Sequence, residues 1–127
     1  MYVFLKILDL SCNFLEDKGL VQLAIQFAKL PKGMHHLNVS HSSLTSKGLT
    51  SLCQSLIANR LNTTTLTYLN ICGNQMKEDS QMLCSFLAQP NVLAILDLSN
   101  TDTPLELLFP GKLFQNLAFI YTMYLCC

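Results

Sequence analysis

The sequence predicts an α/β fold in which parallel strands line one side of a curved array and helices line the other. Three observations predict it. The spacing L-x-x-L-x-L-x-x-N-x-L is written out near residue 5 and returns near residues 34, 66 and 93. The copies therefore begin 29, 32 and 27 residues apart. A stretch with helical periodicity follows each of the first three copies, and a proline follows two of those stretches.

This spacing is the leucine-rich repeat signature, in which one strand and one helix form each repeat. Within the first strand, Leu8 and Leu10 point inward while the intervening Asp9 points outward. The intervals lie at or slightly above the long end for this repeat, and regular helices favour its ribonuclease-inhibitor-like form. We therefore expect a solenoid with parallel strands on the concave face and helices on the convex face. The apolar positions are filled by Leu5, Leu8, Leu10 and Leu15; Met34, Leu37, Val39 and Leu44; Leu66, Leu69, Ile71 and Met76; and Leu93, Leu96 and Leu98.

One polar residue follows each strand where the chain must turn. An asparagine there can hydrogen-bond backbone groups that would otherwise be buried without partners. Serine and threonine can do so less well. We assign this structural role to Asn13, Ser42, Asn74 and Thr101.

The helices have recognisable starts and ends. Asp17 and Ser46 occupy equivalent positions, and we expect both to act as N-caps. Pro31 and Pro90 follow the first and third helical stretches as stop signals. In the fourth copy, "TPLELLFPG" predicts a short helix capped by Thr103.

The repeats fill residues 1–113, and we expect residues 114–127 to form a degraded fifth repeat or a divergent tail. Half of the 127 residues are hydrophobic and 13% are charged, against roughly 25% in an ordinary soluble domain. Repeat arrays need polar caps at their ends, and neither end of this sequence reads as one. We therefore expect a piece of a longer repeat protein whose exposed ends favour self-association.

Several classes of function find little support in the sequence. The net charge is zero without a basic cluster, which does not favour a nucleic-acid partner. No apolar run reaches the roughly 18 residues of a membrane span, so we expect no transmembrane segment. No C-x-x-C pair suggests zinc, and the adjacent His35 and His36 diverge on a strand. We expect no cofactor, no metal and no enzymatic activity.

Stacked repeats bring the outward strand positions into columns along the concave face. Solenoids commonly bind partners on this surface, and the aromatic residues Tyr68 and His36 are the candidate anchors. The alternative interpretation is a solvated polar ladder that keeps the face soluble. The candidate protein-binding residues are Ile7, His36, Tyr68 and Ile95 in one column and Asp9, Asn38, Asn70 and Asp97 in the next.

Stretches between the repeat leucines resemble a particular family. "FAKLPKGMHHLNVS", "LTSKGLTSLCQSL", "FLAQPNVLAILDLSNT" and the "LEDKG" turn are similar to the leucine-rich repeat region of the CARMIL family, from about Leu5 to Leu113. Members of that family regulate actin capping protein and link to myosin-I. Its membrane-binding domain and its capping-protein-binding segment lie outside this region, so the resemblance assigns no capping-protein-binding residue here.

The resemblance implies a non-catalytic scaffold for protein–protein interaction in a regulator of actin filament capping. It also implies a cytoplasmic location, with the longer parent protein acting at the cell cortex or plasma membrane. Cortical actin regulators are then the expected partners. Two alternatives stay open: a structural repeat segment without binding of its own, and a repeat module of another class, tropomodulin-like or from an innate-immune sensor.

Overall fold

The computed structural model describes residues 5–77 and 81–103, and the backbone of residues 119–121. Each strand is three residues long, and the helix predicted after Thr103 lies outside the described residues. The elements in chain order are β1 (Ile7–Asp9), α1 (Glu16–Phe27), β2 (His36–Asn38), α2 (Ser46–Ala58), α3 (Arg60–Thr65), β3 (Tyr68–Asn70), α4 (Gln81–Ala88), β4 (Ile95–Asp97) and β5 (Phe119–Tyr121).

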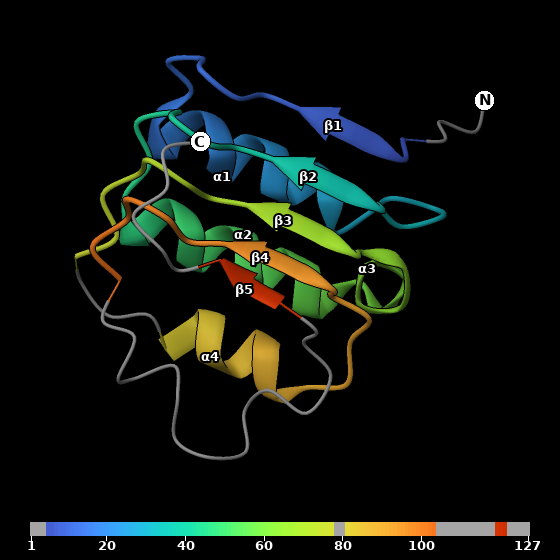
Figure 1. The fold of residues 1–127 in the computed structure, drawn as a ribbon. Helices are drawn as coiled ribbons and strands as arrows, with labels where there is room; N and C mark the ends of the chain where they lie inside the picture. The colour runs from blue at the N-terminus through green and yellow to red at the C-terminus, as the bar shows by residue number, and fades with distance from the viewer. Residues whose placement is uncertain (1–4, 78–80, 104–118, 122–127) are drawn as a thin grey trace.

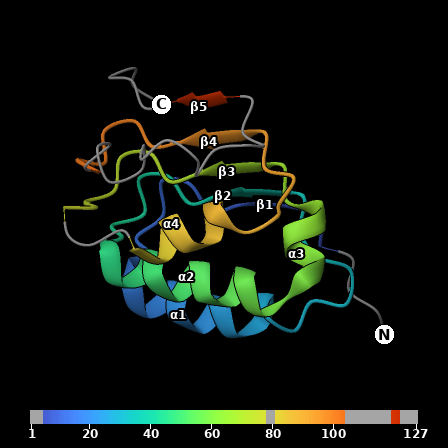
Figure 2. The ribbon, with the colours of Figure 1, turned by 90° about the horizontal axis from the view of Figure 1, so that it is seen from below.

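The strands form one parallel sheet in the order β1-β2-β3-β4-β5, so sequence neighbours are also neighbours in space (Figure 1). Seen along the layers, the strands lie on one side and helices α1, α2 and α4 on the other (Figure 2). A parallel connection needs a crossover, and here each helix supplies it. The predicted leucine-rich repeat solenoid is confirmed. Strand β5 lies within residues 114–127, the segment predicted to be a degraded repeat or tail.

The core runs between the two layers and continues from repeat to repeat. The inward leucines Leu37, Leu69 and Leu96 pair in register across β2, β3 and β4, and their side chains are fully buried. Helix α2 contacts both α1 and α4, so no helix packs alone. A single repeat cannot bury its apolar face, and stacking supplies the missing neighbours.

Helix α3 is an addition that the repeat pattern does not predict, and it lengthens the second repeat to 32 residues. Two asparagines join it to the first repeat. Asn59 caps α3 by accepting a hydrogen bond from Leu61 N (3.1 Å) and donates to the carbonyls of Phe27 and Leu30. Asn62 is fully buried and also donates to the Phe27 carbonyl. These bonds satisfy carbonyls at the end of α1 that have no partner within the helix.

The N-caps predicted for the first two helices are wrong, and the one predicted at Thr103 precedes residues outside the described part of the chain. Helix α2 begins at Ser46, and its cap is the preceding Thr45, whose hydroxyl accepts from Lys47 N at 3.3 Å. Helix α1 begins at Glu16 without a side-chain cap. Asp17 lies inside its first turn and accepts hydrogen bonds from the backbone N–H (2.8 Å) and hydroxyl of Thr45. The acidic side chain therefore links the first repeat to the second, a contact that local sequence rules do not anticipate.

The turns after strands β1 to β4 share a left-handed backbone conformation at one repeated position. Cys12, His41, Gly73 and Asn100 share this position, with φ between 48° and 70°. Glycine adopts such angles without steric strain, yet only Gly73 is a glycine. A Cβ atom on Gly73 would lie 2.3 Å from atoms of the His41 ring, so the ring packs against the bare backbone.

Candidate functional site

The candidate site is the outward surface of the sheet, which we call the sheet-face strip. It consists of the eight predicted residues on β1 to β4, and the observed register brings them together in the two predicted columns. Ile7, His36, Tyr68 and Ile95 pair in sequence across the strands, as do Asp9, Asn38, Asn70 and Asp97.

Each residue of the polar column makes the same local hydrogen bond. Its Oδ1 atom accepts from the backbone N–H two residues later, at 2.9 to 3.0 Å in all four repeats. Short Asx side chains bond in this way to backbone groups that leave a strand. The column therefore fixes the exit of strands β1 to β4, and its side chains are held in one orientation.

The carboxylate of Asp9 has further partners. Ser11 donates to it through its hydroxyl at 2.6 Å, and Asn38 Nδ2 lies 3.4 Å from its second oxygen. The hydrogen bonds from Ser11, together with the one from Asn38 and the nearby His36, hold the pKa of Asp9 below its ordinary value. Bonds donated to a carboxylate favour its charged form, so Asp9 is ionised at neutral pH.

The other column contains a stacked pair of rings. The His36 and Tyr68 ring centroids lie 4.0 Å apart with an interplanar angle of 9°. The Tyr68 hydroxyl oxygen also accepts a hydrogen bond from Asn70 Nδ2 at 3.1 Å. The two columns are thus joined by a side-chain bond, and the two half-buried rings stand face to face in the middle of the strip.

The strip is not equally accessible along its length. Ile7 is 66% exposed and Asp9 is exposed, whereas Asn70 is only 6% exposed. The remaining five residues are half-buried. Asn70 is therefore largely withdrawn from the surface, where its Nδ2 donates to the Tyr68 hydroxyl. The alternation of the sequence gives the face of each residue correctly, but it carries no signal for the ring stacking or for this burial.

The four turn residues hydrogen-bond the backbone in different ways. Asn13 donates to the carbonyls of Leu10 (3.0 Å) and Ser11 (3.1 Å). Ser42 and Thr101 use their hydroxyls, which donate to the carbonyls of Ser40 and Leu98 among others. Asn74 makes the largest set of bonds. Its Nδ2 donates to Val39, Ile71 and Cys72 carbonyls, and its Oδ1 accepts from Ser42 N (3.0 Å) and Leu44 N (3.1 Å).

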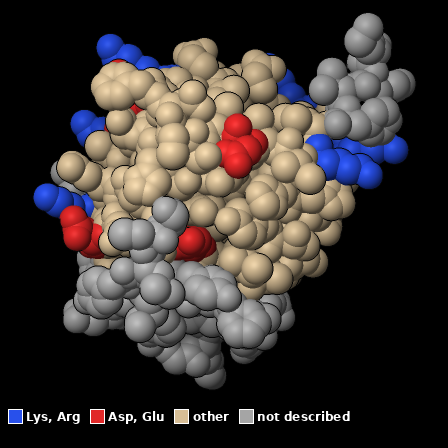
Figure 3. Space-filling model, turned by 45° about the horizontal axis from the view of Figure 1, so that its top comes forward, with Lys and Arg blue, Asp and Glu red and all other residues tan. Residues whose placement is uncertain are grey.

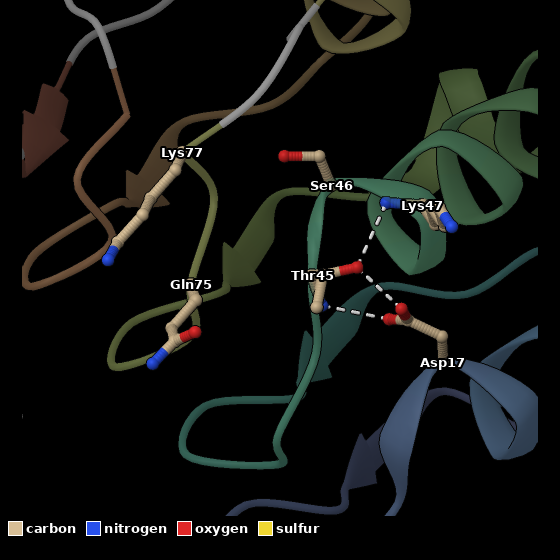
Figure 4. Close-up of a pocket in the computed structure, with 6 residues that line it drawn as sticks. All are labelled: Asp17, Thr45, Ser46, Lys47, Gln75 and Lys77. Atoms are coloured by element: carbon tan, nitrogen blue, oxygen red, sulfur yellow. Dashed lines mark hydrogen bonds between the residues drawn. The ribbon is translucent and has the colours of Figure 1, made fainter.

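A pocket lies beside the first turns of α1 and α2, away from the sheet face. It has a volume of about 320 Å³ and is lined by Asp17, Thr45, Ser46, Lys47, Gln75 and Lys77 (Figure 4). The Asp17 carboxylate is already held by Thr45, and the side chains of Gln75 and Lys77 point away from that pair. The pocket is therefore a depression between repeats whose polar groups do not converge on a common point.

Other chemistry is sparse in the part of the chain that the structure describes. Among those residues, no three histidine, cysteine or acidic side chains are grouped closely enough to hold a metal ion. No helix within the same residues combines the length and the apolar character needed to cross a bilayer.

Comparison with known proteins identifies the repeats. A family model described as "Leucine Rich repeat" matches residues 3–24 and 34–53. Over 109 residues, 84% of this chain, the sequence is 38% identical to "Capping protein, Arp2/3 and myosin-I linker protein 3" of Homo sapiens. By its repeats the chain belongs to the CARMIL family. The resemblance drawn from the linker and helix residues is thereby confirmed.

Two Dictyostelium discoideum proteins extend the comparison. "Protein CARMIL" is 38% identical over 100 residues, 78% of this chain. "Rho GTPase-activating protein gacW" is 33% identical over 96 residues, 75% of this chain. The chain spans 8% of the human CARMIL-family protein and 10% and 9% of these two. The similarity therefore concerns the repeats, and the activities of those long proteins do not transfer with it.

Proposed function

We propose that the chain is a non-catalytic scaffold that binds other proteins through the sheet-face strip. It belongs to a longer regulator of actin filament capping that works in the cytoplasm at the cell cortex. The similarity to the human protein named for linking capping protein, Arp2/3 and myosin-I supports this setting. Its partners are then proteins of the cortical actin cytoskeleton.

The observation that carries the proposal is that the side chains of the strip are held in fixed conformations. Every polar residue of the column is fixed by the same backbone hydrogen bond, and the two rings beside it are stacked. Side chains that are already fixed lose little conformational freedom when a partner binds. Aromatic residues on such a surface are frequent hot spots of protein interfaces.

A matched pair of substitutions tests the proposal. Ile7 lies on the strip and is 66% exposed, and Ile25 lies on α1 and is 46% exposed. Replacing either with arginine adds the same bulk and charge without opening a core cavity. Tagged wild-type chain, Ile7→Arg and Ile25→Arg are used to capture proteins from a cell lysate, and recovered proteins are quantified by mass spectrometry.

We expect Ile7→Arg to lose cortical actin proteins that wild type and Ile25→Arg both retain. Equal recovery by all three chains contradicts a binding role for the strip. That outcome favours the alternative of a structural repeat segment without binding of its own.

A further inference from the structure

Charged residues are segregated between the two ends of the repeats. Every acidic residue that the structure describes lies on the side where strands end and helices begin: Asp9, Glu16, Asp17, Asp97 and Asp102. Four exposed cations lie on the opposite side, where strands begin and helices stop, which we call the strand-entry end: Lys6, Lys29, Lys32 and Arg60. Figure 3 shows lysine and arginine atoms at its right-hand side with no acidic atoms among them.

The fold gathers these cations from separate parts of the sequence. The loop of residues 28–35 carries two of them and lies between the other two. On one side of the loop, the His35 N–H donates to the Lys6 carbonyl at 2.9 Å. On the other side, Asn59 at the start of α3 donates to the Leu30 carbonyl at 3.0 Å. The cations are therefore brought to one end by tertiary hydrogen bonds, although they are not clustered in the sequence.

The cations are not needed to stabilise the helix that they follow. Basic side chains often do so near the last turn of a helix, where carbonyls lack partners. At the end of α1, the Phe27 and Leu30 carbonyls already accept hydrogen bonds from Asn59 and Asn62. No acidic residue occurs in the span 18–77, so no carboxylate of that span offsets the positive charge. The strand-entry end therefore carries an excess of positive charge.

Exposed apolar side chains occur at the same end. Leu61 of α3, which follows Arg60, is 43% exposed, and Val92 in the loop after α4 is 45% exposed. Outside the first repeat, no other large hydrophobic side chain of the described residues is as exposed. The Val92 N–H donates to the Thr63 carbonyl at 3.2 Å, so this loop lies against α3. Helix α3 itself stands at this end of both layers (Figure 2).

Cations combined with exposed apolar side chains are typical of surfaces that bind an anionic membrane from one side. The headgroups attract lysine and arginine, and the apolar side chains enter the boundary with the acyl chains. An acidic protein segment would pair with the cations alone and leave the apolar residues in water. We propose that the strand-entry end docks on the surface of an anionic membrane, with Leu61 and Val92 at the headgroup boundary.

This orientation leaves the sheet-face strip accessible. The strip lies on the outward face of the strands, whereas the strand-entry end lies where the strands begin. A membrane at that end runs past the beginnings of the strands and does not cover their outward face. The chain can then hold a protein on the strip while it lies on a membrane. The inference thus goes beyond the proposed function and concerns a separate surface.

The test measures flotation of the full chain with phosphatidylcholine vesicles that contain or lack phosphatidylserine. Flotation separates vesicle-bound chain from aggregates, which sediment. The test variant combines Lys6→Gln, Lys29→Gln and Arg60→Gln. The control variant removes the same charge from three exposed lysines at the opposite end: Lys18→Gln, Lys47→Gln and Lys77→Gln. All six side chains are exposed, so neither variant disturbs the core.

We expect wild type and the control variant to bind the anionic vesicles, and to bind more weakly as salt is added. Each cation near an anionic membrane contributes about a fivefold factor in affinity, so the test variant should bind about ten- to a hundredfold more weakly. A second pair of variants tests the apolar contribution. Leu61→Ser with Val92→Ser should weaken binding, whereas Val21→Ser with Ile25→Ser, which changes exposed residues of α1, should not.

Equal binding by the test and control variants overturns the inference, and so does equal binding to vesicles with and without phosphatidylserine. A glutamate-rich peptide serves as the alternative ligand. If it binds wild type and the vesicles do not, the strand-entry end recognises an acidic protein segment and the membrane is the wrong partner. The proposed function is tested separately, because lysate capture with Ile7→Arg does not depend on vesicle binding.

Discussion

The first and third repeats contain the same asparagine in the same turn, but its surroundings differ. Asn74 is 1% exposed and accepts hydrogen bonds from Ser42 N and Leu44 N of the preceding repeat. Asn13 is exposed, and among the described residues its Oδ1 accepts no hydrogen bond. Both donate to carbonyls of their own turn. An interior turn asparagine therefore satisfies carbonyls of its own turn and, through its Oδ1 atom, backbone N–H groups of the repeat before it.

The strand leucines repeat this contrast. Leu69 is fully buried between β2 and β4, whereas Leu8 on β1 is only partly buried. In a repeat array, stability is approximately the sum of contributions within repeats and between neighbours. An interior repeat packs against two neighbouring repeats, whereas the first described repeat packs against one. Matched substitutions in the two places measure that difference.

The largest effect is expected from the strand leucines. Leu69→Ala removes a buried side chain from a packed interior and should lower the free energy of unfolding by roughly 3–5 kcal/mol. Leu8→Ala should lower it by roughly half as much, because the site is already open on one side. Urea unfolding followed by circular dichroism measures both values. Equal losses would mean that the first repeat is packed as completely as the third.

The turn asparagines come next. Asn74→Ala leaves the N–H groups of Ser42 and Leu44 and at least two carbonyls buried without partners, which should destabilise the fold by roughly 2–4 kcal/mol. Asn13→Ala leaves only carbonyls near the surface, so we expect about 0.5–1 kcal/mol. Thermal unfolding of the two variants beside wild type makes the comparison. A loss from Asn13→Ala as large as that from Asn74→Ala would remove the distinction between the two sites.

A buried thiol gives a pH-dependent version of the comparison. Burial, with a smaller effect from Cys84, raises the pKa of Cys53 from 9.0 to about 12. The unfolded chain releases this proton near pH 9 and the folded chain keeps it, so stability falls as the pH rises through that window. The slope from this group is about 1.4 kcal/mol per pH unit, and it is absent below pH 9.

Unfolding free energies of wild type and Cys53→Ala between pH 8 and the onset of alkaline unfolding measure this slope, which should be shallower in the variant. Identical slopes would mean that Cys53 is accessible in the folded chain. Alkylation at neutral pH gives an independent check. A maleimide should modify the exposed Cys12 of the first repeat rapidly and Cys53 only after unfolding.

The smallest effect concerns the left-handed turn position. Cys12 has a φ of 57°, where the third repeat has Gly73. Cys12→Gly relieves the steric penalty of this conformation, but it also gives the unfolded chain more freedom. We expect a net gain of about 0.5 kcal/mol. Gly73→Ala should destabilise the fold by more than that, because the added methyl group meets the His41 ring. A loss of stability in Cys12→Gly would show that the cysteine side chain makes contacts that outweigh the strain.

Much of the fold could be predicted from the sequence because the repeat spacing carries it. The alternation of apolar residues gives both the inward leucines and the two outward columns, and the parallel register follows from equivalent positions. Helix α3 was missed because its Thr-rich segment has little apolar periodicity. Its position depends instead on Asn59 and Asn62, which bond to carbonyls about 30 residues earlier.

The candidate site was predictable in composition but not in detail. The sequence places His36 and Tyr68 in one column, but the stacking of their rings depends on side-chain angles that the alternation does not specify. Asp17 was expected to cap its own helix because aspartate is a good N-cap. In the structure it bonds to Thr45 of the next repeat, and this tertiary contact outweighs the local preference.

The three-residue length of every strand has one more consequence. A partner that crosses the sheet meets each repeat at only one residue in each column. The number of repeats therefore sets the number and spacing of the possible contacts. Equivalent positions of neighbouring repeats lie about 4.8 Å apart along the strip, although 27 to 32 residues of sequence separate them. Loss of one repeat would shorten the strip by one such step and displace every later position relative to a bound partner.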